Sequence, residues 1–267
     1  MFPLVLSVLG VGALPADLAD FAARMKASVV KLSVEDASGE EVGNGSGFFV
    51  SAGGRIVTNH HVIEHVGNGR MRALLADGRK IDILGVLADD EENDVAVVQA
   101  AGTGYAPLAM GDSTTLKVGE GVAVISSPRG YAGTLSEGII SAIRPAGAKL
   151  HPTDEDYTKA WKIQHTADVS PGSSGSPLML RDGRVVGVVV GLVSGEHLNF
   201  AIPIEAARKL LDGLAPDARP KSLGPSVRRN LLISAAGLAV VLAAWFLISR
   251  AGQGGRRGKR PPPRVYS

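Results

Sequence analysis

Short apolar segments recur through the middle of this chain at roughly ten-residue spacing, and they limit its fold more than any other feature. Examples are SVVKLSV, RIVTN, DVAVVQ, GVAVIS and RVVGVVVGLV, separated by Gly, Asp, Asn or Pro turns. Segments of this length that are rich in β-branched residues and bounded by turn residues are typical of strands. The pattern predicts an all-β fold, either barrels or a sandwich.

Two helices are expected to frame these strands. One covers residues 18–27, and the other covers residues 204–214, where apolar side chains recur at three- and four-residue steps. Residues 215–230, rich in Pro and charge, are expected to form a tether. The sequence shows no internal repeat strong enough to use.

Both ends of the chain carry apolar stretches. Residues 2–14 have the length of a signal peptide and are followed by small residues, so we assign residues 1–16 to a signal segment. A misassigned start and a buried N-terminal strand are the alternatives. Residues 231–249 carry no charge, and a helix of about 20 residues spans a hydrocarbon core of roughly 30 Å. We predict a transmembrane helix there.

The flanking charges orient that helix. Arg228 and Arg229 precede it, whereas six Arg and Lys residues lie in the tail 250–267. The positive-inside rule places this tail in the cytoplasm and residues 17–214 on the periplasmic or extracellular side. The net charge of +2 gives no reason to expect a nucleic acid as partner. The absence of cysteine excludes disulfides and a thiol nucleophile.

The stretch SPGSSGSPL, residues 170–178, raises the question of a serine nucleophile. A serine hydroxyl needs an imidazole as base and a carboxylate to orient that imidazole. TNHHVI at 58–63 and NDVAVV at 93–98 supply candidates. The order His, Asp, Ser matches two-barrel proteases and differs from that of α/β-hydrolases. The alternative is an ordinary Gly/Ser turn.

Ser174 fits the nucleophile best. Gly172 lies two positions before it and Gly175 directly follows it, which suits a turn whose backbone N–H groups bind an oxyanion. The predicted oxyanion donors are the N–H groups of Gly172 and Ser174.

These segments resemble the HtrA (Deg) family of trypsin-like serine proteases over roughly residues 18–214. The resemblance is carried by GNGSGFFVSAGGRIVTNHHVI, ENDVAVVQ, SSPRGYAGTLSEGIISAI, IQHTADVSPGSSGSPL and LNFAIPIEAARKLL. It implies a protease domain of two antiparallel β-barrels over residues 17–214, with the triad His61, Asp94 and Ser174. His60 takes the place of a residue that is usually asparagine, and we interpret it as a local structural group.

The resemblance implies an endopeptidase that cuts extended or unfolded polypeptides through an acyl-enzyme. No cofactor is expected, and no metal, since no HExxH or comparable ligand spacing occurs. Whether the chain assembles into a homo-oligomer stays an open question at this point. HtrA enzymes usually carry PDZ domains where this chain has its tether and apolar segment. The second function considered is a catalytically silent peptide-binding or scaffold protein of the same fold.

Asp168 is a candidate for the specificity pocket because it lies six residues before Ser174. A carboxylate buried there would need a partner, which a substrate Arg or Lys could supply. Against this, HtrA-like pockets usually accept small or medium apolar side chains. Asp168 could instead point to solvent, or pair with His165 or Lys162.

Overall fold

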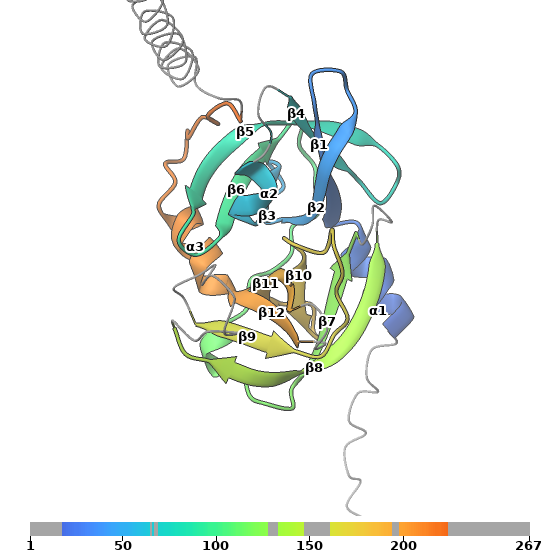
Figure 1. Ribbon diagram of the computed structural model, residues 1–267, viewed down its shortest axis with the longest axis vertical. Coiled ribbons are helices and arrows are strands. Elements are labelled where there is room, and N and C mark those ends of the chain that lie inside the picture. The colour runs from blue at the N-terminus through green and yellow to red at the C-terminus, as the bar shows by residue number, and fades with distance from the viewer. Residues whose placement is uncertain are drawn as a thin grey trace, which may run out of the picture. The chain divides into compact units, whose positions relative to one another are not determined.

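The first barrel is formed by residues 29–100 (Figure 1). Its six strands pair antiparallel in the closed order β1-β2-β3-β6-β5-β4. They are β1 (Val29–Glu35), β2 (Glu41–Phe49), β3 (Arg55–Thr58), β4 (Arg70–Leu74), β5 (Lys80–Asp90) and β6 (Val95–Ala100). Closure leaves this sheet without a free edge along its length.

The second barrel repeats the strand order of the first. β7 (Gly121–Ser126), β8 (Thr134–Arg144), β9 (Lys162–His165), β10 (Pro177–Leu180), β11 (Val185–Val193) and β12 (Leu198–Pro203) close in the order β7-β8-β9-β12-β11-β10. All pairs are antiparallel. The fold is therefore two closed antiparallel barrels, and the sandwich alternative is excluded.

The computed structural model describes residues 18–64, 66, 69–127, 133–146, 161–193 and 198–223. The predicted signal segment, transmembrane helix and basic tail lie outside these residues, as do His65, His151 and His197. Within the described part of the chain, no helix is long and apolar enough to cross a membrane.

Three apolar clusters form the core. One lies in the N-terminal barrel around Leu32, Phe49 and Ile56, and one lies in the C-terminal barrel around Val124 and Leu178. The third contains residues of both barrels, including Phe48, Val57, Ile125 and Ile202. Because apolar side chains of both barrels are buried together, the barrels pack directly on each other.

Helices cover parts of both barrels. α1 (Leu18–Lys26) buries Phe21, and α3 (Ile204–Asp212) buries Ile204 and Ala207. Both agree with the predicted helices to within two residues. The short α2 (His60–Glu64) follows β3, and a 3₁₀ turn covers Ser113–Thr115. Although α3 follows the last strand of the second barrel, it also packs against β5 and β6 of the first.

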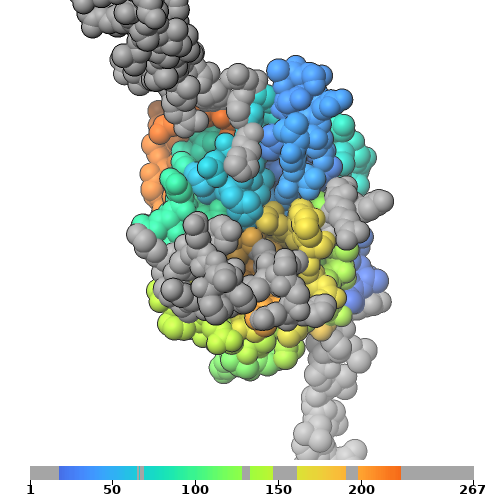
Figure 2. Space-filling model, in the orientation of Figure 1, coloured from blue at the N-terminus to red at the C-terminus, as the bar shows by residue number. Residues whose placement is uncertain are grey.

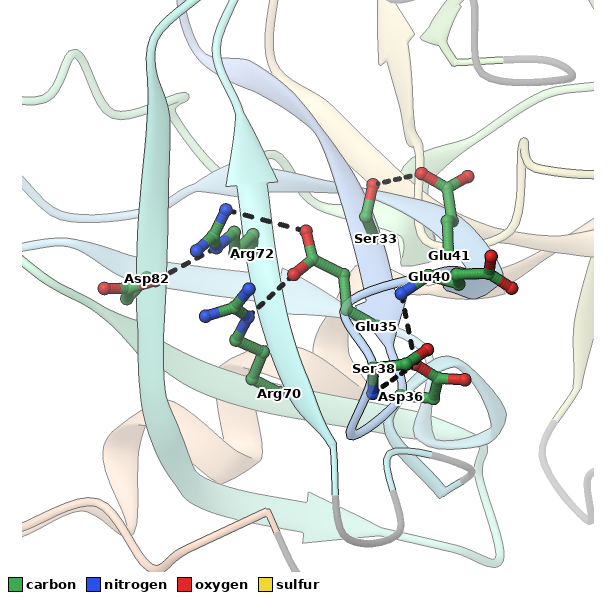
Figure 3. A network of polar contacts seen from close by, with 9 residues as sticks. All are labelled: Ser33, Glu35, Asp36, Ser38, Glu40, Glu41, Arg70, Arg72 and Asp82. Atoms are coloured by element: carbon green, nitrogen blue, oxygen red, sulfur yellow. Dashed lines mark hydrogen bonds and ion pairs between the residues drawn. The ribbon is translucent and has the colours of Figure 1, made fainter.

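An ionic network lies on one side of the N-terminal barrel, across β1, β4 and β5 (Figure 3). Glu35 is only 7% exposed, and Arg70 Nε donates to its carboxylate at 2.7 Å. Arg72 contacts both this carboxylate, at 3.7 Å, and Asp82, at 3.3 Å. The hydrogen bond from Arg70 helps hold the pKa of Glu35 below its usual value. The network allows a carboxylate to be buried on the barrel wall.

The chain after α3 returns to the N-terminal barrel. Lys221 N–H donates to the Val86 carbonyl at 2.7 Å, and Val86 N–H donates to the Lys221 carbonyl at 2.8 Å. Leu223 packs against the core cluster of that barrel. The described part of the predicted tether is therefore docked on β5 as far as Leu223.

Candidate active site

His61 lies in α2, directly after β3 of the N-terminal barrel. Its backbone N–H donates to Asp94 Oδ1 at 2.9 Å, and its ring Nδ1 lies 2.8 Å from Asp94 Oδ2. A carboxylate can only accept, so Nδ1 carries the proton in this pair. Nε2 is then the ring nitrogen that can accept a proton, and the side chain is 43% exposed. The pair has the geometry of a base with its orienting acid.

Asp94 is buried at the turn that leads into β6, with 6% exposure. Its backbone φ is +52°, the one positive value among the described residues other than glycine. Asn59 is fully buried, and its Nδ2 donates to the Asp94 carbonyl at 2.8 Å. A strained backbone that neighbouring groups hold in place is a common feature of functional sites.

The acidic residues before Asp94 have other partners. Asp90 accepts from Asn93 Nδ2 at 2.7 Å, and Asp89 Oδ2 lies 3.2 Å from His60 Nδ1. His60 therefore faces Asp89, whereas His61 faces Asp94. This arrangement agrees with the local structural role expected for His60.

Ser174 lies in a tight turn between β9 and β10 of the C-terminal barrel. Ser173 N–H donates to Ser170 O at 2.8 Å, and Ser176 N–H donates to Ser173 O at 3.0 Å. Gly172 and Gly175 have φ values of +96° and +86°, which favour glycine. Among the described residues, no carbonyl accepts from the N–H groups of Gly172 and Ser174. These two donors are available to an oxyanion.

Gly175 is required by a close approach between the barrels. A Cβ at this position would lie 2.0 Å from the Ser46 carbonyl oxygen and 2.4 Å from Thr58 Oγ1. Backbone groups cannot give way by such a distance without a shift of the chain. The glycine after Ser174 therefore lets the turn that carries Ser174 pack against β2 and β3.

His61 and Ser174 come from different barrels, and the segments that carry them meet near Gly45. A Cβ on Gly45 would lie 2.8 Å from the side chain of Val62 and 3.2 Å from the Ser174 carbonyl oxygen. Ser174 Oγ donates to the Val190 carbonyl at 3.3 Å and, among the described residues, makes no hydrogen bond to His61. The structure thus joins His61 to Asp94 and places the serine turn beside α2. In Figure 2 the yellow segment between β9 and β10 adjoins the blue and cyan surface of the N-terminal barrel.

Asp168 is exposed. Selection of a substrate Arg or Lys by this residue was expected for a buried carboxylate, and the structure does not bury it. Its backbone carbonyl accepts from Ser136 Oγ at 2.7 Å. Of the alternatives considered, orientation toward solvent fits the structure. His165 is instead buried, and its burial lowers its pKa from 6.5 to about 4.

Three buried residues that support the site were not identified from the sequence: Ser46, Thr58 and Asn59. Thr58 and Asn59 directly precede the two histidines, so their place in TNHHVI could have marked them. Ser46 Oγ donates to the carbonyl of Gly172, 126 residues away, and no local pattern predicts such a contact. No group of three metal-ligating side chains occurs in the part of the chain that the structure describes.

The geometry agrees with comparisons to known proteins. A family model for the trypsin-like peptidase domain matches residues 45–188, more than half of the chain. The chain belongs to the trypsin-like peptidase family. The matched range contains His61, Asp94 and Ser174.

The similarity extends to HtrA and DegP proteins. The chain is 37% identical over 190 residues to a probable periplasmic serine endoprotease DegP-like of Chlamydia pneumoniae, covering 69% of this chain and 37% of that protein. It is 31% identical over 237 residues to the serine protease PepD of Mycobacterium tuberculosis, covering 81% of this chain and 50% of that protein. The matches thus span half or less of these curated relatives. The trypsin-like domain is thus similar in sequence to part of a DegP-like protease and part of PepD.

A solved structure shows the same fold. The HtrA-type protease AlgW, determined with a tripeptide, aligns with a TM-score of 0.64 at 24% identity. The alignment covers 75% of this chain and 64% of that one. At this identity the comparison supports the two-barrel fold alone.

Proposed function

We propose that this trypsin-like domain is a serine endopeptidase that uses His61, Asp94 and Ser174 as its catalytic triad. The observation that carries the proposal is the double contact of His61 with Asp94, through Nδ1 at 2.8 Å and through the backbone N–H at 2.9 Å. This contact leaves Nε2 free to act as the base. The relatives named a probable serine endoprotease and a serine protease support the same activity.

In the proposed reaction, Ser174 Oγ attacks the carbonyl carbon of the substrate peptide bond while His61 Nε2 takes the hydroxyl proton. The oxyanion is bound by the N–H groups of Gly172 and Ser174, which are free of backbone acceptors among the described residues. His61 then gives its proton to the leaving amine. Water, deprotonated by His61, hydrolyses the acyl-enzyme and regenerates Ser174.

A strand edge that is unpaired among the described residues suits an extended polypeptide as substrate. β11 pairs with β12 as far as Val193, whereas its pairing with β10 ends at Val188. The Val189 N–H still bonds to Ser176, so the edge of β11 begins to open at Val190, whose carbonyl lies 3.3 Å from Ser174 Oγ. A substrate strand added along this edge would bring its peptide bonds to the nucleophile.

A catalytically silent peptide-binding protein is the second candidate function. The observation in its favour is that Ser174 Oγ donates to Val190 and, among the described residues, not to His61. A fluorophosphonate probe separates the two. Covalent labelling of the full-length chain that is lost in Ser174→Ala and His61→Ala supports the enzyme. Absence of labelling together with retained peptide binding supports the silent protein.

Turnover tests the triad assignment directly. Triad members act as a unit, so we expect Ser174→Ala and His61→Ala each to abolish casein cleavage, with little further loss in the double variant. His60→Ala should keep most of the activity because His60 faces Asp89. Loss of cleavage in His60→Ala but not in His61→Ala would contradict the assignment.

We further propose that the domain is exported and held at the membrane by residues 231–249, with the C-terminal tail in the cytoplasm. The uncharged apolar segment and the six basic residues after it support this topology. Protease added outside spheroplasts should remove the catalytic domain and leave a fragment that ends at Ser267. Detection of a tag at Ser267 from outside intact spheroplasts would reverse the orientation.

A further inference from the structure

Ser46 connects the two barrels at the nucleophile turn. It lies in β2, is fully buried, and its hydroxyl donates to the Gly172 carbonyl at 2.8 Å. The same hydroxyl accepts from the N–H of Ser127, the residue directly after β7, at 3.0 Å. The backbone N–H of Ser46 donates to the Ser174 carbonyl at 2.7 Å. One residue of the first barrel thus binds the second barrel at three points.

Two of these three points hold the turn that presents the oxyanion donors. Gly172 has no side chain and a φ of +96°, so its backbone has few restraints of its own. The Ser46 hydroxyl fixes the Gly172 carbonyl, and the Ser46 N–H fixes the Ser174 carbonyl. These bonds fix the peptide groups that follow Gly172 and Ser174, and with them the turn from which the N–H groups of Gly172 and Ser174 project.

Ser46 is also connected to the segment that carries the base. Thr58 Oγ1 donates to the Ser46 carbonyl at 2.7 Å, and Thr58 is three residues before His61. The Ser46 backbone therefore lies between the end of β3 and the nucleophile turn. Since His61 and Ser174 come from different barrels, this connection sets the distance between base and nucleophile.

Burial alone does not explain these contacts. Ser176 is equally buried, yet its hydroxyl has no partner among the described residues. The Ser46 hydroxyl instead uses its donor and one acceptor on backbone groups that are 126 and 81 residues away. A serine at this position is thus fitted to the turn.

We propose that Ser46 is a positioning residue that holds the oxyanion-binding turn open and aligns Ser174 with His61. The proposal rests on the proposed peptidase function. Loss of the Ser46 hydroxyl leaves the Gly172 carbonyl free to turn, and it leaves the buried N–H of Ser127 without this acceptor. The consequence falls on the transition state, where the oxyanion forms, and not on binding of the substrate.

The test compares Ser46→Ala with Ser113→Ala in the full-length chain. Ser113 is a matched control because it is 2% exposed and bonds through its hydroxyl to Glu205, away from the nucleophile turn. We expect Ser46→Ala to lower kcat roughly 10- to 100-fold with KM changed less than about twofold, compared with 10²- to 10³-fold for loss of one oxyanion donor. Ser113→Ala should leave both constants near those of the wild type. Ser46→Cys has a weaker donor of similar shape, so its kcat should lie between that of Ser46→Ala and that of the wild type.

Inhibitor binding gives a readout that a merely structural role would not change. A peptide boronic acid accepts Ser174 Oγ at boron, the hydroxyl proton passes to His61, and the anionic boronate places an oxygen at the oxyanion site. The same peptide ending in an alcohol forms no such adduct. Ser46→Ala should lower the affinity for the boronic acid at least about tenfold and the affinity for the alcohol less than about twofold. Measurements are made where circular dichroism shows each variant folded.

The outcomes separate this proposal from the proposed function. Suppose that the wild type turns over substrate and that Ser46→Ala keeps the wild-type kcat and boronate affinity, or loses affinity for boronate and alcohol equally. Either result overturns the role of Ser46 and leaves the peptidase function intact. If Ser46→Ala does not fold, the same comparison on Ser46→Cys decides. A wild-type chain without turnover or labelling refutes the peptidase and this inference with it.

Discussion

His61 and Asp94 are joined by two separate hydrogen bonds, one from the ring Nδ1 at 2.8 Å and one from the backbone N–H at 2.9 Å. The two carboxylate oxygens are thus used for different tasks. Oδ1 fixes the start of α2, and Oδ2 fixes the ring and its tautomer. Both the position and the protonation pattern of the histidine depend on one carboxylate.

Asp94→Asn tests the second task while keeping the first. An Asn oxygen can still accept from the backbone N–H of His61, which turns its NH₂ toward Nδ1 and forces the ring proton to Nε2. That tautomer cannot accept the serine proton. We expect kcat on a fluorogenic peptide to fall roughly 10⁴-fold with little change in thermal stability. Asp89→Asn is the control, and a comparable loss there would contradict the assignment.

Gly85→Ala tests the docking of the chain after α3. Gly85 has a φ of +151°, and a Cβ there would lie 2.1 Å from the Lys221 carbonyl oxygen. Gly78→Ala is the control because its φ is +87° with no atom within 4 Å of the new Cβ. Gly78→Ala should lower the free energy of unfolding by about 1 kcal/mol, from backbone strain alone.

We expect Gly85→Ala to lower the free energy of unfolding by more than Gly78→Ala does, and to release residues 218–223 from β5. Hydrogen exchange at the Lys221 amide reports the release, because this N–H is bonded to Val86. Urea unfolding compares the two variants. Unchanged protection of the Lys221 amide in Gly85→Ala would show that the contact does not hold this segment.

The strands with β-branched runs were predictable from sequence because local pattern defines them. GVAVIS matches β7, and RIVTN contains β3. The start of β2 carries no such local pattern, since the strand begins at Glu41 and includes Gly43, Asn44 and Gly45, which are typical of turns. Pairing with β1 along its length overrides that local preference. The short α2 carries no periodic signal and was not predicted.

The candidate site was predictable only in part, for the same reason. His61, Asp94 and Ser174 lie in local motifs with a characteristic order, and so could be proposed. Ser46 contacts the turn of Ser174 only after both barrels close, because the two residues are far apart in sequence. The exposure of Asp168 also depends on the tertiary structure, so sequence left its orientation open.

His165 makes stability depend on pH. Burial lowers its pKa in the folded chain from 6.5 to about 4, so the unfolded chain binds the extra proton between these values. This shift adds about 3 kcal/mol to the free energy of unfolding. The contribution is fully present above about pH 6.5 and is lost as the pH falls toward 4. We expect His165→Leu to flatten the pH dependence of the unfolding free energy in this range, measured by urea denaturation. An unchanged slope would show that other groups cause it.

Asp168 allows a test of substrate preference. Because its side chain is exposed to water, it does not need a substrate cation as a partner, and an exposed ion pair contributes only about 0 to 1 kcal/mol. Val190 is a partly buried apolar residue whose carbonyl lies 3.3 Å from Ser174 Oγ, so an apolar side chain is present near the proposed nucleophile. We therefore expect a peptide library to show Val, Ala or Leu before the cut, both in the wild type and in Asp168→Ala. Asp182→Ala, at an exposed aspartate after β10, controls for loss of surface charge. An Arg or Lys preference in the wild type that disappears in Asp168→Ala alone would show that this carboxylate selects the substrate despite its exposure.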